Sequence, residues 1–436
     1  MLRRVVYVAL CVSAFTVASP GPAAAQNLRD ELRQLFTFGT CGELVCLSNL
    51  TGIHGEHFKL SADSDGTALI GFLGSSIGLS VSNTPISSSS SGTTFKLVGG
   101  VPVKTSTSAG PIFGERAQTL GRGRWFVGLG LTQMNFERLR GVPLNGITFN
   151  YTHQDVGDTA TGAGIDTLGS PAFENDFINV KMALDVNLLV ASLSMTYGLV
   201  DGIDVGVTVP FVRTSIHGNS VAQVVPAGGA ILHYFSGSAQ DPVLTAVSSA
   251  DGAATGIGDV EGHLKINVAQ GDKTGAALFV SARFPTGDEN NLLGSGAFSG
   301  RALGVFSARF GTFSPHINLG YTVRDATDQN NSVDGALGYD ALLSPWATMA
   351  VDLLASWEIG TSRLRVPPPV QYLAPAHRTL DVTNIPGQPD NLMSLNLGFK
   401  FRTRRGIQLV TNALFPLRDS GLQPSVAWTG GLEYNF

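Results

Sequence analysis

Ionisable side chains at every second position are the residues of this sequence best placed to do chemistry. In the stretch DVEGHLKINVAQ (259–270), Glu261, His263 and Lys265 alternate with glycine and large apolar residues. Successive side chains of a strand point to opposite faces, so these three share one face. Such a face, turned into a closed sheet, can line a path for solutes. Later strands add candidates with the same spacing, namely Arg283, Arg301, Arg309, Arg324, Asp340, Asp352 and Glu358.

The charges of this polar face allow two interpretations. Five cations on successive strands within 257–325 would be neighbours around a wall, and a basic stripe of that kind attracts organic acids. The stripe consists of Lys265, Arg283, Arg301, Arg309 and Arg324. Asp340, Asp352 and Glu358 would then face it across the lumen. In the alternative interpretation, the mixed charges form salt bridges that only hold the wall in shape.

Other arrangements of reactive residue types match known sites poorly. In HGEH (54–57), the two histidines lack the helical spacing that zinc proteases require. The oxygen-rich stretch TGDENN (286–291) could attract calcium, but it also fits a solvated loop. The sequence has no Walker-type phosphate loop and no G-x-S-x-G motif, and no histidine falls on the apolar face of the strands. We therefore predict no enzyme activity, no cofactor and no metal site.

Composition limits the elements that can position these residues. The chain has 436 residues, of which 53 are glycine and only 14% are charged. Mean hydropathy is +0.17, yet no internal stretch has the eighteen continuous apolar residues of a membrane helix. Apolar residues spread over alternate positions are typical of a transmembrane β-barrel.

From about Gly121 onward the chain alternates apolar and polar residues with period two. We predict an all-β fold: a transmembrane antiparallel up-and-down barrel with apolar side chains outward. The segment 145–154 is expected to rise above the membrane as a hairpin with the second strand. If 145–154 and 93–105 instead join the wall, the count becomes fourteen. The twelve predicted strands are 123–137, 178–199, 202–214, 257–270, 274–286, 297–311, 312–325, 332–344, 346–360, 391–404, 406–416 and 424–436.

The predicted connections alternate strictly between short and long. Short turns on the periplasmic side and long loops on the outer side are how outer-membrane barrels are built. The short set is 199–204, 270–275, 311–315, 343–346 and 403–406. The long set is 138–177, 213–256, 286–297, 325–332, 361–391 and 417–424.

The final stretch VAWTGGLEYNF (426–436) predicts a strand that closes the barrel by pairing with the first strand. Its apolar face would end at a periplasmic aromatic girdle. A terminal Phe preceded by alternate apolar residues also resembles the signal that the outer-membrane assembly machinery recognises. The residues concerned are Trp428, Leu432, Tyr434 and Phe436.

The N-terminus predicts export. Two arginines, an apolar run and an Ala-x-Ala pattern indicate a signal peptide over 1–25; a lipoprotein signal at Cys11 is the alternative. Cys41 and Cys46 then remain, and an oxidising compartment permits a disulfide between them. Two free thiols are the alternative.

The segment 26–118 precedes the predicted barrel, which takes up 119–436. Residues 27–36 have apolar residues at helical spacing, and 67–83 favours a helix over a strand. This leading segment could sit in the periplasm, fold into the barrel as a plug, or form a disordered leader.

Charge and location limit the partners. After signal cleavage 26 basic and 33 acidic residues remain, a net charge of about −7, without a long basic cluster. Nucleic acid is therefore not an expected partner. The expected partners are the lipid bilayer, the assembly machinery and small organic solutes, while the oligomeric state is not indicated.

Four motifs in order resemble one family. They are ERAQTLGRGRWFVGLGL (115–131), LSMTYGLVDGIDVGVTVPFV (193–212), GIGDVEGHLKI (256–266) and FVSARFPTGD (279–288). Over about 120–436 the chain resembles the outer-membrane family named for the meta-pathway of phenol degradation. That family is related to channels for hydrophobic compounds, including long-chain fatty-acid transporters. The resemblance implies a channel for small hydrophobic or aromatic compounds; the alternative is a non-transporting surface barrel for partner binding or envelope structure.

Overall fold

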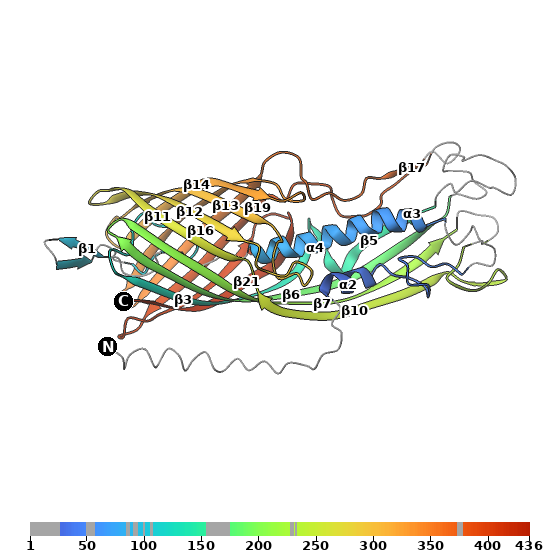
Figure 1. Ribbon diagram of the computed structural model, residues 1–436, viewed down its shortest axis with the longest axis horizontal. Coiled ribbons are helices and arrows are strands. Elements are labelled where there is room, and N and C mark those ends of the chain that lie inside the picture. Colours follow the sequence, from blue (N-terminus) through green and yellow to red (C-terminus); the bar gives the residue numbers. More distant parts are fainter. Residues whose placement is uncertain are drawn as a thin grey trace.

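A closed antiparallel barrel is the main element of the computed structural model (Figure 1). The structure describes residues 27–48, 57–83, 88–89, 95–98, 101–104, 108–153, 175–226, 231, 233–372 and 378–436. The prediction of a twelve-stranded all-β barrel is confirmed. Its strands are β3 (Trp125–Leu139), β6 (Phe177–Val200), β7 (Ile203–Val225), β11 (Val260–Gln270), β12 (Thr274–Phe284), β13 (Phe298–Ala308), β14 (Phe313–Asp325), β15 (Ser332–Ser344), β16 (Ala347–Glu358), β19 (Leu392–Arg402), β20 (Gln408–Pro416) and β21 (Leu422–Asn435).

The last strand closes the barrel against the first, as predicted. β21 runs antiparallel to β3 with Leu432 opposite Leu129, and two bulges interrupt the register near Pro424. The backbone N–H of Trp125 donates to the carbonyl of Phe436 at 2.9 Å, and the N–H of Phe436 donates back at 3.0 Å. Closure therefore leaves β21 no unpaired edge at this end.

The fourteen-strand alternative is wrong. β5 (Ile147–Thr152) pairs with the outer part of β6, where Thr152 lies opposite Phe177. The segment around 93–105 contains instead the hairpin of β1 (Phe95–Val98) and β2 (Val101–Lys104), which pair with each other. Neither segment adds a strand to the wall.

The predicted long loop over 213–256 is wrong for most of its length. β7 continues to Val225, and β10 (Thr245–Ile257) runs back along it in continuous register. The sequence pattern did not predict this strand pair, because small polar residues alternate along it and its outer face carries few large apolar side chains. β5, β6, β7 and β10 together form a sheet that extends beyond the outer end of the barrel (Figure 1).

Helices of the leading segment cover the inner face of this extension. Asn27 caps the first helix, since its side chain accepts from the N–H of Asp30 at 2.9 Å. The predicted helix over 67–83 is confirmed and packs its apolar side chains into the largest hydrophobic cluster. The elements are α2 (Leu28–Gln34), α3 (Lys59–Ser61), η2 (Ala62–Gly66) and α4 (Thr67–Ser82).

Short elements complete the connections. They are β4 (Val142–Pro143), η3 (Leu144–Gly146), β8 (Ser236–Ser238), β9 (Asp241–Val243), β17 (Val370–Tyr372) and β18 (Arg378–Leu380). Cys41 and Cys46 are joined in a disulfide next to the extension. The predicted signal peptide lies outside the described residues.

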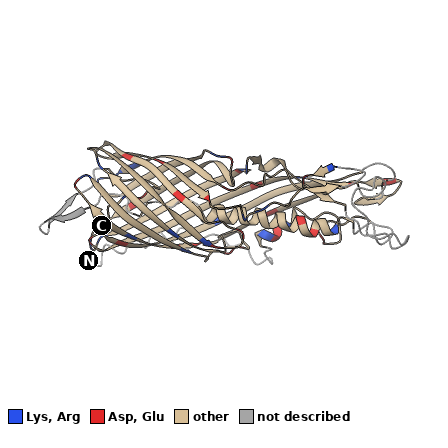
Figure 2. Cartoon of the chain, turned by 90° about the horizontal axis from the view of Figure 1, so that it is seen from above, with Lys and Arg blue, Asp and Glu red and all other residues tan. Residues whose placement is uncertain are grey.

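The barrel is apolar outside and polar inside. Leu319, Leu337 and Trp428 are exposed by 63%, 57% and 59%, whereas the inward-facing Asp352 and Asn396 are fully buried. Figure 2 accordingly shows few charged positions along the barrel strands. Among the described helices, none combines the length and the apolar character needed to cross a bilayer, which says nothing about crossing by strands.

Aromatic residues ring the end of the barrel where the short turns lie. Exposed rings occur at Trp125 and Phe436, which are paired at this end of the closing strands, at Tyr434, and at Trp346 between β15 and β16. A closed barrel with an apolar outer face and such a girdle has the architecture of bacterial outer-membrane proteins. The chain is therefore located in the bacterial outer membrane.

Candidate functional site in the barrel lumen

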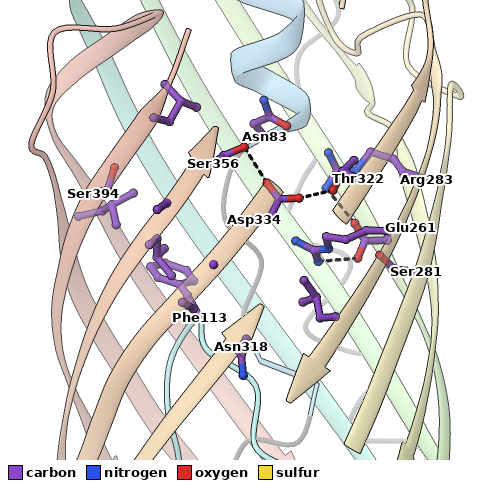
Figure 3. A pocket seen from close by; sticks show the side chains of 18 of the residues that line it. Asn83, Phe113, Glu261, Ser281, Arg283, Asn318, Thr322, Asp334, Ser356 and Ser394 are labelled. Carbon is purple, nitrogen blue, oxygen red and sulfur yellow. Dashed lines mark hydrogen bonds and ion pairs between the residues drawn. The ribbon is translucent and has the colours of Figure 1, made fainter. Parts of the chain in front are cut away.

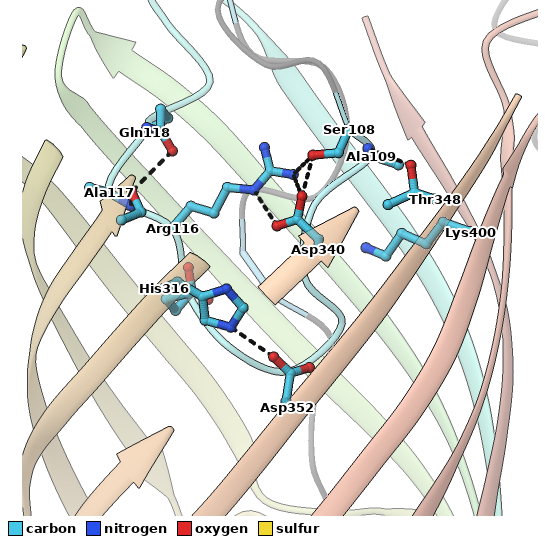
Figure 4. Close-up of polar contacts among 12 residues, drawn as sticks. Ser108, Ala109, Arg116, Ala117, Gln118, His316, Asp340, Thr348, Asp352 and Lys400 are labelled. Atoms are coloured by element: carbon cyan, nitrogen blue, oxygen red, sulfur yellow. Dashed lines mark hydrogen bonds and ion pairs between the residues drawn. The ribbon is translucent and has the colours of Figure 1, made fainter. Parts of the chain in front are cut away.

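Residues 108–120 of the leading segment lie inside the barrel and are bonded to its wall (Figure 4). The backbone N–H groups of Ala109, Ala117 and Leu120 donate to Thr348 Oγ1 at 3.0 Å, Ser307 Oγ at 3.1 Å and Asp204 Oδ2 at 2.9 Å. Irregular backbone at membrane depth must be satisfied by protein or water. The polar inner face of the strands supplies these partners.

Two ion pairs fix this lumen segment to two separate strands of the wall, β15 and β11. Arg116 Nε lies 3.4 Å from Asp340 Oδ1, and Lys265 Nζ lies 2.6 Å from Glu115 Oε2. All four side chains are buried. A buried charge without a counter-charge is strongly unfavourable, so each wall charge favours the lumen segment in this position.

The acids predicted to face the basic stripe have other partners. Asp340 binds Arg116 and Ser108 of the lumen segment. Asp352 accepts from His316 Nε2 at 2.7 Å and from the Phe113 N–H at 3.4 Å. The expected transverse arrangement is thus replaced by local bonds, because the lumen segment stands between the two sides of the wall.

Glu358, Arg309 and Lys265 also do not form part of a basic stripe that faces acids across an open lumen. Glu358 accepts from the Asp390 N–H at 3.2 Å, near the outer rim. Arg309 follows β13 and donates to the carbonyl of Asp272 in the neighbouring short turn, at 3.0 Å. Lys265 is bound to Glu115.

The remaining three predicted cations line a chamber above the lumen segment (Figure 3). The chamber has a volume of about 290 Å³. Glu261 Oε2 pairs with Arg283 Nη2 at 2.8 Å, and its Oε1 lies 3.6 Å from Arg301 Nη2. Arg324 Nη1 donates to the carbonyl of Asn330 at 2.7 Å. Three guanidinium groups therefore share this wall.

Carboxylates and an imidazole complete the polar wall. Asp334 accepts from Ser356 at 2.7 Å and from Thr322. His263 Nε2 lies 3.2 Å from Thr196 Oγ1, and its ring stacks on Phe279 with centroids 5.4 Å apart. With Glu261 and Asp334 against three arginines, this wall of the chamber has an excess positive charge.

The opposite wall of the chamber is apolar. It comes from β19, β20, β21 and β3, which lie across the barrel from β12–β14. The end of α4, with Ser80 and Asn83, lies above the chamber, and Phe113 and Glu115 of the lumen segment lie below it. The large apolar side chains of this wall include Met134, Phe136, Leu392, Leu414 and Leu422. A cationic wall facing an apolar wall suits a molecule that has one anionic end and one apolar end.

Sequence reasoning missed Glu115, Arg116 and Phe113. They precede the first strand, in a stretch with no periodic pattern, so only tertiary structure brings them to the wall. The one signal present was the pair of adjacent opposite charges in ERAQTLG. Lys400 of β19 and Glu433 of β21 form another buried ion pair, with Nζ and Oε2 3.1 Å apart.

Comparison with known proteins yields structural likeness only. No family model matches the chain, and no curated protein matches it in sequence. An outer-membrane channel from Pseudomonas putida F1 superposes with a TM-score of 0.41 at 12% identity, covering 73% of this chain and 98% of that one. A FadL homologue from Pseudomonas aeruginosa gives 0.32 at 12% identity, covering 72% and 89%. A mutant of the monoaromatic hydrocarbon channel TodX gives 0.33 at 10%, covering 74% and 91%. Likenesses this low carry no information about substrate, and the phenol-pathway family remains a resemblance.

Proposed function

We propose that the protein is an outer-membrane channel for small organic compounds with an aromatic or other hydrophobic body. The observation that carries the proposal is the chamber within the lumen, with arginines on one wall and large apolar side chains on the other. A chamber of about 290 Å³ is at the small end of ligand sites, which begin at roughly 300 Å³. Its size therefore favours compounds of about one ring.

The charge of the polar wall refines this proposal. Arg301 has a side chain that is 36% exposed, and it lies farther from Glu261 than Arg283 does. Its guanidinium is the one best placed to bind a passing carboxylate, because Arg283 and Glu261 satisfy each other at 2.8 Å. An aromatic acid would then place its ring against the apolar wall.

Replacing Arg301 should lower the uptake of acids and leave the uptake of neutral compounds unchanged. In a Gram-negative host producing Arg301→Gln, we expect initial uptake of benzoate to fall by roughly fivefold, as for the loss of one charged hydrogen bond that is partly exposed. Uptake of toluene should stay unchanged. The measurement is uptake of radiolabelled compound against cells with the wild-type gene and cells with no gene.

Arg309→Gln is the matched control, since it removes the same charge from a short turn outside the chamber. It should leave uptake of both compounds at the wild-type level. Equal uptake with and without the wild-type gene would overturn transport and favour the non-transporting surface barrel. An equal loss in both arginine variants would refute the role of the chamber while leaving a channel in place.

A further inference from the structure

Three histidines far apart in the sequence meet at the outer end of the extension. His57 precedes α3, His153 follows β5, and His233 lies between β7 and β8. One ring nitrogen from each lies within 4.8 Å of the others, and all three side chains are buried. We propose that these histidines bind a divalent transition-metal ion of the zinc class, with Asp176 orienting His233.

Pairing of the extension strands brings these residues together. β5 and β6 pair with Thr152 opposite Phe177, so His153 and Asp176 are the next residues on the two strands. Ser61 Oγ of α3 accepts from the N–H of Thr152 at 3.0 Å, which holds the stretch containing His57 beside β5. The carbonyl of Tyr234 accepts from the Ser48 N–H at 2.8 Å, next to His233.

The nitrogens have a spacing close to that of a metal-ligand set. His233 Nε2 lies 3.2 Å from His57 Nδ1. A zinc ion at about 2.0–2.1 Å from each of its tetrahedral ligands needs ligand atoms roughly 3.3 Å apart. One pair already has this separation, and the 4.8 Å limit leaves the third ring a movement of about 1.5 Å at most. Small side-chain rotations are therefore enough.

Asp176 occupies the position of an outer carboxylate in such a site. Its Oδ2 is bonded to Nδ1 of His233, the ring nitrogen that faces away from His57. A proton held on Nδ1 by this bond directs the Nε2 lone pair toward the cluster, as in carboxylate–histidine–zinc arrangements. The close contact between His233 Nε2 and His57 Nδ1 requires a proton between the two nitrogens. A metal ion would take the place of that proton.

The surroundings of the cluster favour a metal over a solvated group of bases. Phe58 is fully buried and packs edge-on against the rings of His153 and His233, with centroids 5.4 Å and 5.2 Å away. Imidazole ligands in an apolar shell are typical of zinc, copper and nickel sites. The ion would join three chain segments of the extension. None of the three histidines lines the lumen chamber, so the site does not depend on the proposed transport.

Among histidine-containing stretches, the sequence prediction of no metal site considered only HGEH. His54 of that stretch lies outside the described residues, so the proposal uses His57 alone. Its partners are 96 and 176 positions away along the chain, by subtraction of 57 from 153 and 233. Motifs based on local spacing cannot detect such a site.

Metal binding by the full mature chain, without a histidine tag, tests the proposal. In detergent at pH 7.5, zinc titration against a chromophoric chelator should show one site per chain. Cobalt should give the visible bands of tetrahedral coordination. His153→Ala and His233→Ala should weaken zinc binding by at least about 100-fold, and Asp176→Asn by roughly 10- to 100-fold.

His217→Ala is the matched control. His217 lies on β7 in the same extension, exposed and 3.6 Å from Asp251, but outside the cluster. The zinc affinity of the His217→Ala variant should equal that of the wild type. Wild-type protein that binds no zinc below about 10 μM, or binding that survives both cluster substitutions, would overturn the site. Heat-dependent mobility of each variant in gel electrophoresis confirms that the barrel is folded, so a folding defect cannot imitate the expected result.

Discussion

Removing residues 27–119 should raise the conductance of the protein in planar bilayers by roughly an order of magnitude, because the lumen would lose its central obstruction. In the full chain, residues 108–120 are bonded to at least six wall side chains around the lumen. Without them, the charges of Asp340 and Lys265 would face water, which hydrates them in an open pore. The measurement is the size of single-channel steps in a salt gradient.

A shorter deletion separates the lumen segment from the rest of the leading segment. Removal of residues 27–48 takes away α2 and the disulfide loop but keeps 108–120 in place. Conductance should then stay at the full-chain level. Equal conductance of all three proteins would show that the lumen segment does not limit passage, whereas an increase in both deletions would assign the obstruction to the extension.

The barrel could be predicted from the sequence because its signal is local and repeated. In LMSLNLGFKFR (392–402) every second side chain is large and apolar, and other wall strands follow the same alternation with glycine or alanine at some outward positions. Bilayer and lumen impose this alternation directly, so it survives without tertiary information. The predicted and observed strand bounds differ most at β7. There the chain leaves the bilayer, and the lipid no longer selects large apolar side chains.

The contents of the barrel could not be predicted in the same way. Alternation indicated which charges face inward, including Asp340, Lys265 and Asp352, but not what they meet. Their partners Arg116, Glu115 and His316 are fixed by the path of a segment without periodicity and by strand register. The direction of the electric field across the lumen depends on those partners. A list of inward-facing charges therefore predicts that the lumen is polar, but it does not predict how the chamber is arranged.

Arg140→Met should free the loop 361–391 from the outer rim at a cost of about 3–5 kcal/mol, the usual penalty for breaking a buried ion pair. Arg140 is 2% exposed and donates to both oxygens of Asp390, at 2.8 and 2.9 Å. It also donates to the carbonyls of Leu364 and Pro386 in that loop, at 2.9 and 3.1 Å. Limited proteolysis within 361–391 should become faster by about two orders of magnitude or more.

Arg138→Met is the control for this prediction. Arg138 lies two residues earlier and pairs with Asp419 at 3.5 Å, but both side chains are largely exposed. Exposed pairs contribute about 0–1 kcal/mol, so the proteolysis rate should change by a factor of a few at most. Similar rates for the two variants would contradict the assignment of Arg140 as the anchor of the loop.

The double variant Arg140→Met/Asp390→Leu tests whether the penalty comes from the orphaned charge. Removing both partners leaves no uncompensated ion, so most of the loss should be recovered. Methionine keeps the same backbone conformation as arginine at a φ of 50°, so strain does not differ between the variants. Recovery would mean that attachment of the loop to the rim depends on neutralising the charge of Asp390. A double variant as labile as the single one would mean that the hydrogen bonds to the loop carbonyls, and the packing of Arg140 over Phe72 at 4.8 Å, hold the loop instead.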